Sequence, residues 1–367
     1  NSFQLGQFLK NNQLGIIAFK GDVKGRGFDW KTLDMTVNGT VHKIQVQNYT
    51  YQNITAKGRL YRQTFAGDFS INDPNAQATG RGMIDFSTSV PSFNLKANIA
   101  QANLRALGLS NEDLALTGRF DVDMSGKDIG SLLGSANISE ATLTHNGERL
   151  SFDSLYVSST YADGRRTLRA RSNELDAVIE GKFDLETLPD AFTLFLNRYY
   201  PAYIKPPRRA FPNQDFTFHI ETGLIEDYIK LVDKRLSGFN YSKIDGSLNV
   251  SSNLFKLNAN VPQFGFEQYS FSDVALTGDG DLDRLQLNGS VSNAVINDSL
   301  TFPQTTFTIN ARNDVSDIVI NTTANQTINK ADLSAQIRTF SNGALVLFNP
   351  SSFVINGKTW NIEQGGE

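Results

Sequence analysis

Short runs of alternating apolar and polar residues constrain the fold of this chain more than any other feature. In the clearest stretch, residues 241–291, Phe255, Leu257, Ala259 and Val261 alternate with polar side chains. Successive side chains of a β-strand point to opposite faces, so this pattern predicts strands with one apolar and one polar face. Gly, Asn, Asp and Ser separate the runs and indicate tight turns between antiparallel strands.

The same pattern continues over most of the chain. Alternating runs recur at residues 65–71, 93–99, 114–124 and 177–185. At about 13 residues for each strand and its turn, we expect some two dozen strands. A sheet with that many strands cannot stay flat, so it must curl or split.

Two stretches have a helical period instead. Residues 188–204 and 223–236 carry apolar side chains at spacings of three and four, which predicts amphipathic helices. We expect them to pack over the sheet; the alternatives are that they cap or gate an apolar trough, or contact a membrane or a partner. Residues 102–109 and 129–133 are predicted to be shorter helical pieces, and residues 1–12 a helical or frayed start.

The domain organisation follows from these patterns. We predict strand-rich repeats over residues 1–187, a helix-containing insertion over 188–240 and further strand-rich repeats over 241–367. Loose repetition, such as the Ala-Leu-Thr-Gly that ends at both Gly118 and Gly278, indicates one continuous array.

Composition excludes several classes of protein. Hydrophobic residues make up 40% and charged residues 20% of the 367 residues, as in an ordinary folded protein. No apolar run is long enough to span a bilayer. A net charge of -4 argues against nucleic acid as a partner, and the lack of cysteine excludes disulfides and thiol chemistry.

Signals for catalysis are weak. The three histidines, His42, His145 and His219, lie far apart in the sequence, and no hydrolase, metalloprotease or phosphate-loop motif is present. Residues 279–283 begin like a calcium loop but lack its later ligands, so we interpret them as a hairpin turn. We predict no enzymatic activity, no catalytic residue, no metal site and no cofactor.

Several motifs resemble those of one family. Residues 49–58 read Tyr-x-Tyr-x-x-Ile-x-x-Lys-Gly, residues 65–75 read Phe-x-Gly-x-Phe-x-Ile-x-Asp-Pro-Asn, and residues 118–126 and 353–360 fit the same pattern. These motifs are similar to those of the TamB proteins of Gram-negative envelopes, in particular of Bacteroidetes, and the resemblance covers most of the chain.

The resemblance implies a fold and a setting. The expected fold is an elongated, curled, mostly antiparallel sheet, shaped like a taco around an apolar groove, as in the AsmA-like, repeating β-groove superfamily. The expected setting is the periplasm, with anchorage in the inner membrane through parts of the protein outside this sequence, because Asn1 is not a start residue.

The resemblance also implies a function. It is bridge-like transport of phospholipids between the inner and outer membranes, with phospholipid and a TamA-like outer-membrane barrel protein as partners. The alternative is a scaffold or chaperone in the assembly of outer-membrane barrel proteins. A third hypothesis for the function is a carbohydrate-active or adhesive β-solenoid.

Thirteen apolar residues are candidates for the lipid-binding floor of such a groove. Alternation alone favours an ordinary filled core for them, whereas the resemblance favours an open groove. The candidates are Phe93, Leu95, Ile99, Phe120, Val122, Phe183, Phe216, Phe218, Leu248, Phe255, Leu257, Leu285 and Leu287.

Overall fold

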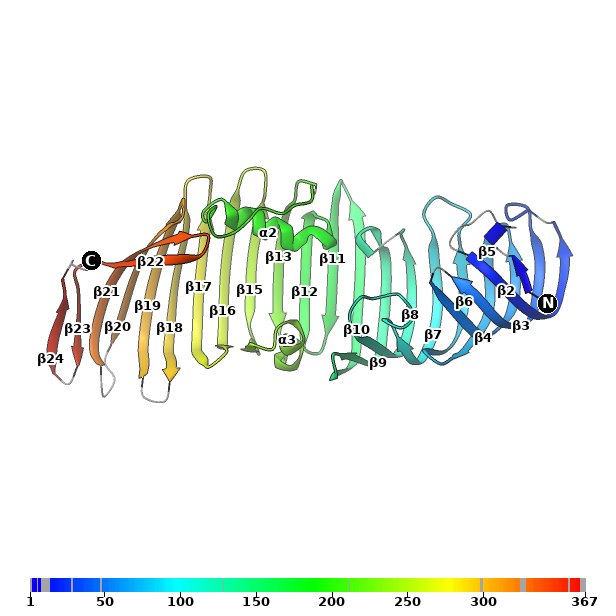
Figure 1. Ribbon diagram of the computed structural model, residues 1–367, viewed down its shortest axis with the longest axis horizontal. Helices are drawn as coiled ribbons and strands as arrows, with labels where there is room; N and C mark the ends of the chain where they lie inside the picture. Colours follow the sequence, from blue (N-terminus) through cyan, green and yellow to red (C-terminus); the bar gives the residue numbers. More distant parts are fainter. Residues whose placement is uncertain are drawn as a thin grey trace. The chain divides into compact units, whose positions relative to one another are not determined.

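The fold is all-β. The computed structural model describes residues 2–4, 6–7, 14–27, 29–46, 48–127, 129–210, 212–297, 300–323, 328–355 and 357–363. It is 69% strand and 7% helix, and it contains 24 strands (Figure 1). The prediction of a curled, mostly antiparallel sheet with a few short helices is therefore confirmed.

The chain divides into two compact units. The first comprises Asn1–Thr160 and Ala170–Asn173, and the second comprises Tyr161–Arg169 and Glu174–Glu367. The helix-containing stretch 188–240 thus lies inside the second unit.

In the first unit each strand pairs antiparallel with the next one in sequence. Its strands are β1 (Ser2–Gln4), β2 (Leu14–Arg26), β3 (Asp34–Val46), β4 (Tyr49–Tyr61), β5 (Thr64–Asp73), β6 (Ala76–Asp85), β7 (Ser92–Asn103), β8 (Leu114–Ser125), β9 (Leu133–His145) and β10 (Glu148–Ala162). A 3₁₀ turn, η1 (Ile129–Ser131), precedes β9.

The second unit is built in the same way, after β11 (Arg165–Ser172), which both units share. Its strands are β12 (Leu175–Lys182), β13 (Asp215–Thr222), β14 (Leu236–Gly238), β15 (Lys243–Asn249), β16 (Leu254–Phe266), β17 (Tyr269–Gly280), β18 (Leu285–Asn297), β19 (Leu300–Arg312), β20 (Val315–Thr323), β21 (Ile328–Phe340), β22 (Gly343–Phe348), β23 (Ser351–Ile355) and β24 (Lys358–Ile362). β13 pairs with β15, β14 pairs with the far end of β16, and β21 pairs with both β22 and β23.

Tight turns join many of these strands. Both central residues have positive φ at Arg62-Gln63, Asn146-Gly147 and Asn313-Asp314. This is the backbone of type I′ turns, whose twist matches that of the flanking strands. The predicted turn at residues 72–75 is also present, between β5 and β6.

The strands of the second unit bend sharply near one end. Asp273 in β17 and Gln304 in β19 have φ of 49° and 46°, a left-handed conformation that is rare for residues other than glycine. The pairing of β16 with β17 is interrupted at the same place. Val261 pairs with Val274, and the next pair joins residues 263 and 272, so Asp273 has no partner in the register. The Ser292 hydroxyl braces the bend by donating to Asp273 Oδ2 at 2.7 Å. A bulge-like irregularity in neighbouring strands curls a sheet at that line.

The helices are shorter than predicted. Helix α2 spans Leu188–Asn197 instead of residues 188–204, and turns follow it up to the pair of prolines at 206–207. Pro201 disfavours helical backbone in the residue before it, and Asn197 Nδ2 donates to Ile204 O at 2.6 Å in the turns.

Helix α3 spans Glu226–Val232 instead of residues 223–236, preceded by a cap in which Asn240 Oδ1 accepts from the Ile225 and Glu226 amides. Residues 104–108 form turns rather than a helix. Most of the predicted start at 1–12 lies outside the described residues.

Candidate ligand groove

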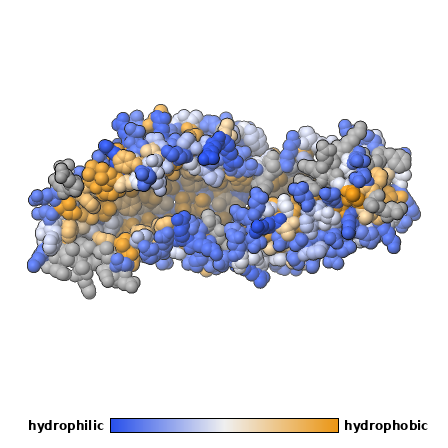
Figure 2. All heavy atoms as spheres, viewed as in Figure 1, coloured by the Kyte–Doolittle hydropathy of each residue, from blue (hydrophilic) through white to orange (hydrophobic). Residues whose placement is uncertain are grey.

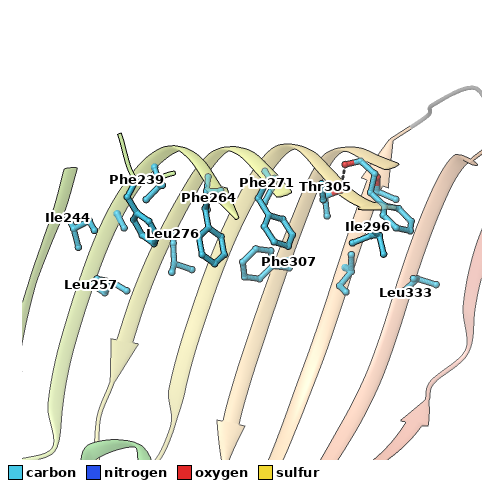
Figure 3. A pocket seen from close by; sticks show the side chains of 18 residues that line it. Phe239, Ile244, Leu257, Phe264, Phe271, Leu276, Ile296, Thr305, Phe307 and Leu333 are labelled. Atoms are coloured by element: carbon cyan, nitrogen blue, oxygen red, sulfur yellow. Dashed lines mark hydrogen bonds between the residues drawn. The ribbon is translucent and has the colours of Figure 1, made fainter. Parts of the chain in front are cut away.

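An apolar groove of about 620 Å³ lies on one face of the second unit. It runs over β15 to β21, where the strands curve over (Figure 3), and Figure 2 shows apolar side chains gathered in a hollow there. Its lining is Phe239, Ile244, Leu257, Ala259, Val261, Phe264, Phe271, Val274, Leu276, Val291, Ala294, Ile296, Phe302, Thr305, Phe307, Ile320, Thr322 and Leu333.

The groove offers a ligand almost no polar partner. Only Thr305 and Thr322 among its 18 lining residues are polar. Their hydroxyls donate to backbone carbonyls, Thr305 to Phe302 at 3.2 Å and Thr322 to Pro303 at 2.8 Å. Among the described residues, no charged side chain lines the groove. The site is therefore suited to hydrocarbon and not to a polar or charged group.

The strand bend creates the concave wall of the groove. Beyond the bend the short arms of β16 and β17 carry Phe264 and Phe271, whose rings stack at 5.6 Å and 16°. Phe239 packs against Phe264 at 5.3 Å from the segment that follows β14. Figure 3 shows these three rings side by side along the curved ends of the strands.

A glycine in β18 lets one more ring lie flat on the floor. A Cβ at Gly289 would approach Phe307 Cζ to 2.2 Å, so the Phe307 ring occupies the space that a side chain at 289 would fill. Because no Cβ stands there, the ring can pack directly on the backbone of β18.

Helix α2 fills the neighbouring part of the same sheet face. Its Ala191 and Phe195, together with Tyr199 in the turn that follows, are almost completely buried against the strands. Phe195 packs against Phe255 with ring centroids 4.9 Å apart. The expectation that this stretch packs over the sheet is confirmed for α2.

Polar contacts fix the end of α2 in place. The Tyr199 hydroxyl donates to Asp281 O at 2.5 Å and accepts from Asn253 Nδ2 at 2.8 Å. Burial raises the pKa of the Tyr199 hydroxyl, so it stays protonated at neutral pH. Asp314 Oδ1 accepts from the Ala202 amide at 2.9 Å. At the other end of the helix, Arg209 Nε contacts Asp190 at 2.6 Å.

The eight candidate floor residues of the second unit gather beneath α2. The buried members are Phe216, Leu248, Phe255 and Leu285, and Phe183, Phe218, Leu257 and Leu287 pack against them. Only Leu257 also lines the groove. Under α2 these side chains form a filled core, as alternation alone would suggest, and the open part of the face lies further along the same strands.

The five candidates of the first unit share one half-exposed face. Register places Leu95 of β7 beside Val122 of β8, and Ala97 beside Phe120. Phe93 and Ile99 flank them on β7. Ile99 also packs against a small cluster in which turn residues 104 and 107 meet Ala76 and Ala102.

Most groove residues were not among the sequence candidates, although the sequence carries a signal for them. Across the bend, apolar spacing changes from two to three: Val261 is followed by Phe264, Phe271 by Val274, and Val291 by Ala294. The two residues between the members of each pair span the bend, so both members point into the groove. A phase shift of one residue inside a long alternating run thus indicates a bend.

The polar face of the first unit has a shallow depression of about 820 Å³ over β5 to β9. Its charges neutralise one another in pairs across the strands, Arg81 with Asp68 at 2.5 Å and Lys96 with Asp121 at 2.9 Å. Exposed pairs of this kind are typical of a solvated sheet face.

The histidines lie on three different strands. His219 is on the polar face of β13, where its Nδ1 contacts Asp245 at 2.5 Å, and His145 Nε2 contacts Glu112 at 3.0 Å. In the described part of the chain no three His, Cys, Asp or Glu side chains are grouped to hold a metal. The turn at 281–284 is a hairpin turn as expected, with Asp281 Oδ1 accepting from the Arg284 amide at 2.9 Å.

None of the helices in the described ranges is both long and apolar enough to cross a bilayer. Comparison of the chain with known protein families, with curated proteins and with solved structures finds no match.

Proposed function

We propose that the groove of the second unit shelters the acyl chains of phospholipids, and that the protein is a segment of a TamB-like conduit that moves lipids between the membranes of a Gram-negative envelope. The observation that supports this proposal is an open apolar groove on a sheet face of which α2 covers another part. A face that served only as core would be covered throughout.

The energetics favour a hydrocarbon ligand. Each methylene transferred from water into an apolar site gains about 0.8 kcal/mol, so a chain of roughly 16 carbons gains on the order of 10 kcal/mol. The lining offers no polar contact that would fix one position along the chain. A chain that slides along the groove exchanges one apolar contact for another at little cost.

The size of the groove sets the number of chains. A volume of 620 Å³ equals roughly 20 groups the size of a water molecule, at about 30 Å³ each. A methylene is of similar size, so the groove accommodates about one long acyl chain. The polar head group would stay at the open side, in water.

A binding experiment with a groove variant tests the proposal. cis-Parinaric acid, a fluorescent fatty acid, is titrated into the purified protein, and lipids that copurify are identified by native mass spectrometry. Leu276→Glu places a carboxylate on the groove floor, and we expect it to weaken parinaric acid binding at least tenfold, because burying an unpaired charge is costly. Transfer of phospholipid between vesicles should fall with it.

Val319→Glu is the matched control. Val319 is 42% exposed on the polar face of β20, so the same charge is added to the same unit on its opposite side. Its binding should stay within about twofold of the unaltered protein. Equal parinaric acid affinity for Leu276→Glu and Val319→Glu, or no binding by the unaltered protein, would refute the proposal.

A further inference from the structure

Strand β22 differs from the long alternating strands of the second unit, because it is exposed on both faces. All six of its residues are exposed, and Leu345, Val346, Leu347 and Phe348 are each between 44% and 48% accessible. We call residues 345–348 the β22 rim. Exposed apolar patches of this kind mark sites of interaction, because they are costly to leave in water.

The β22 rim is apolar on both faces of the sheet. Register places Val346 beside Ile337, on the side of β21 that carries the groove residue Leu333. It places Leu345 beside Arg338 and Leu347 beside Gln336, on the opposite, polar side. There Gln336 Nε2 donates to Asp317 Oδ1 at 3.0 Å, so the two leucines interrupt a polar surface.

The rim is also free of charge and open at one edge. Residues 339–357 contain no Asp, Glu, Lys or Arg. β22 pairs with β21 along one edge, and β23 also pairs with β21, so within the described ranges no strand pairs with the other edge of β22. Native sheets usually place charged residues on such an edge to prevent association, and this one does not.

We propose that the β22 rim inserts into the surface of a lipid bilayer and lets acyl chains pass between that surface and the groove. A protein docked on the sheet would cover one face only, and a strand added at the edge would leave both rows of side chains uncovered. A fluid apolar phase surrounds both faces at once. Figure 2 shows apolar side chains on the border of the hollow in this part of the second unit.

The open backbone edge limits the depth of insertion. Unpaired amide and carbonyl groups are not tolerated in the hydrocarbon interior, so the strand rests at the boundary between head groups and acyl chains. The absence of charge means that the attraction is apolar and does not depend on anionic lipids or on ionic strength.

Vesicle flotation tests this inference, which rests on the proposed function of the groove. The protein is mixed with vesicles of phosphatidylcholine and phosphatidylethanolamine at low and at high salt. We expect it to float with them at both, and we expect Leu345→Gln combined with Leu347→Gln to reduce the bound fraction at least tenfold. Both side chains are exposed, so the substitutions leave the core intact.

The control pair is Leu254→Gln combined with Val319→Gln. These residues are 52% and 42% exposed on the polar face of β16 and β20. Flotation of this pair should match the unaltered protein. Because the chain has no cysteine, Leu347→Cys and Leu254→Cys also accept a polarity-sensitive dye; a blue shift on adding vesicles is expected at 347 and not at 254.

Three results would overturn the inference: no flotation of the unaltered protein, equal flotation of the β22 pair and the control pair, or a dimer in sedimentation that the β22 substitutions convert to a monomer. Parinaric acid binding, measured without vesicles, separates failure of the β22 inference from failure of the proposed groove. If the unaltered protein binds the fatty acid but does not float, only the β22 inference fails; if it does not bind the fatty acid, the proposed function fails.

Discussion

The two ends of the long strands in the second unit both carry apolar side chains but have different surroundings. At one end α2 covers them, and Leu248 is fully buried. At the other end the strands bend, and Phe264, Phe271 and Phe307 line an open groove. The same alternation of residues therefore gives a core in one place and a ligand site in the other.

The element that covers the strands, and not the strands themselves, therefore decides whether the apolar face becomes a core or a groove. Ala191 and Phe195 of α2 are buried against the strands, and the Tyr199 hydroxyl fixes the turn that follows the helix. Nothing comparable covers the bend in the described residues. Four predictions test whether the two regions differ in energy as they do in packing.

The largest difference is expected for truncation of a ring. Phe195→Ala, under α2, removes a side chain that is 2% exposed, and we expect it to lower the free energy of unfolding by about 3–5 kcal/mol. Phe307→Ala, in the groove, removes a ring with open space beside it and should cost less than about half as much. Denaturant titration of both variants measures this, and equal costs would mean that the groove is packed as a core.

Two glycine substitutions sharpen the contrast. A Cβ at Gly280 would lie 2.6 Å from Phe195 Cζ, which α2 holds in place, whereas a Cβ at Gly289 meets Phe307, which can swing into the groove. We expect Gly280→Ala to cost about 1–3 kcal/mol. Gly289→Ala should cost less than about 1 kcal/mol but weaken parinaric acid binding. The reverse order of stability would contradict the assignment.

The Tyr199 hydroxyl should make the stability of the α2 region depend on pH in the alkaline range. Burial raises its pKa above the ordinary value of 10.0, so its contribution to stability is complete below about pH 10 and is lost as pH rises through the folded-state pKa. Tyr199→Phe should cost about 1–2 kcal/mol at neutral pH, because it leaves a buried carbonyl with fewer donors. Denaturant midpoints measured from neutral to alkaline pH should fall less steeply for this variant than for the unaltered protein.

The smallest effect is expected at the surface of α2. Arg209 Nε lies 2.6 Å from Asp190, but the arginine side chain is 55% exposed. Exposed ion pairs contribute about 0–1 kcal/mol, so Asp190→Asn should change the free energy of unfolding by at most about 0.5 kcal/mol, and less at high salt. A loss of several kcal/mol would show that this pair, and not the buried rings, anchors α2.

Alternation predicted the fold class because each strand needs only its own residues to show one apolar and one polar face. Phe255, Leu257 and Ala259 share a face as expected. The helical stretch 188–204 was recognised by its spacing, but its end was placed too late. Pro201 is a local signal for an earlier end, because it disfavours helical backbone in the residue before it. The hydrogen bond from Asn197 to Ile204, which holds the turns after α2, forms only in the folded chain.

The division of the apolar face into core and groove could not be predicted from alternation. Whether Leu248 or Leu276 stays open depends on where α2 docks, and that contact joins residues far apart in the sequence. The bend was likewise missed. Gln304 is not a residue type typical of left-handed backbone, and an aspartate such as Asp273 occurs too often elsewhere to mark a bend by itself. The spacing of three between Val261 and Phe264 is the local signal that would have located it.

The pairing of strands has a consequence for how such a protein changes in length. Within each unit nearly every strand bonds to its neighbours in sequence, and turns of two residues join many of them. Removing or duplicating one hairpin, such as β17 with β18, therefore leaves every remaining partner beside a strand of the same direction. The reach of the sheet can be adjusted in steps of about 10 Å, two strand spacings, without a new topology.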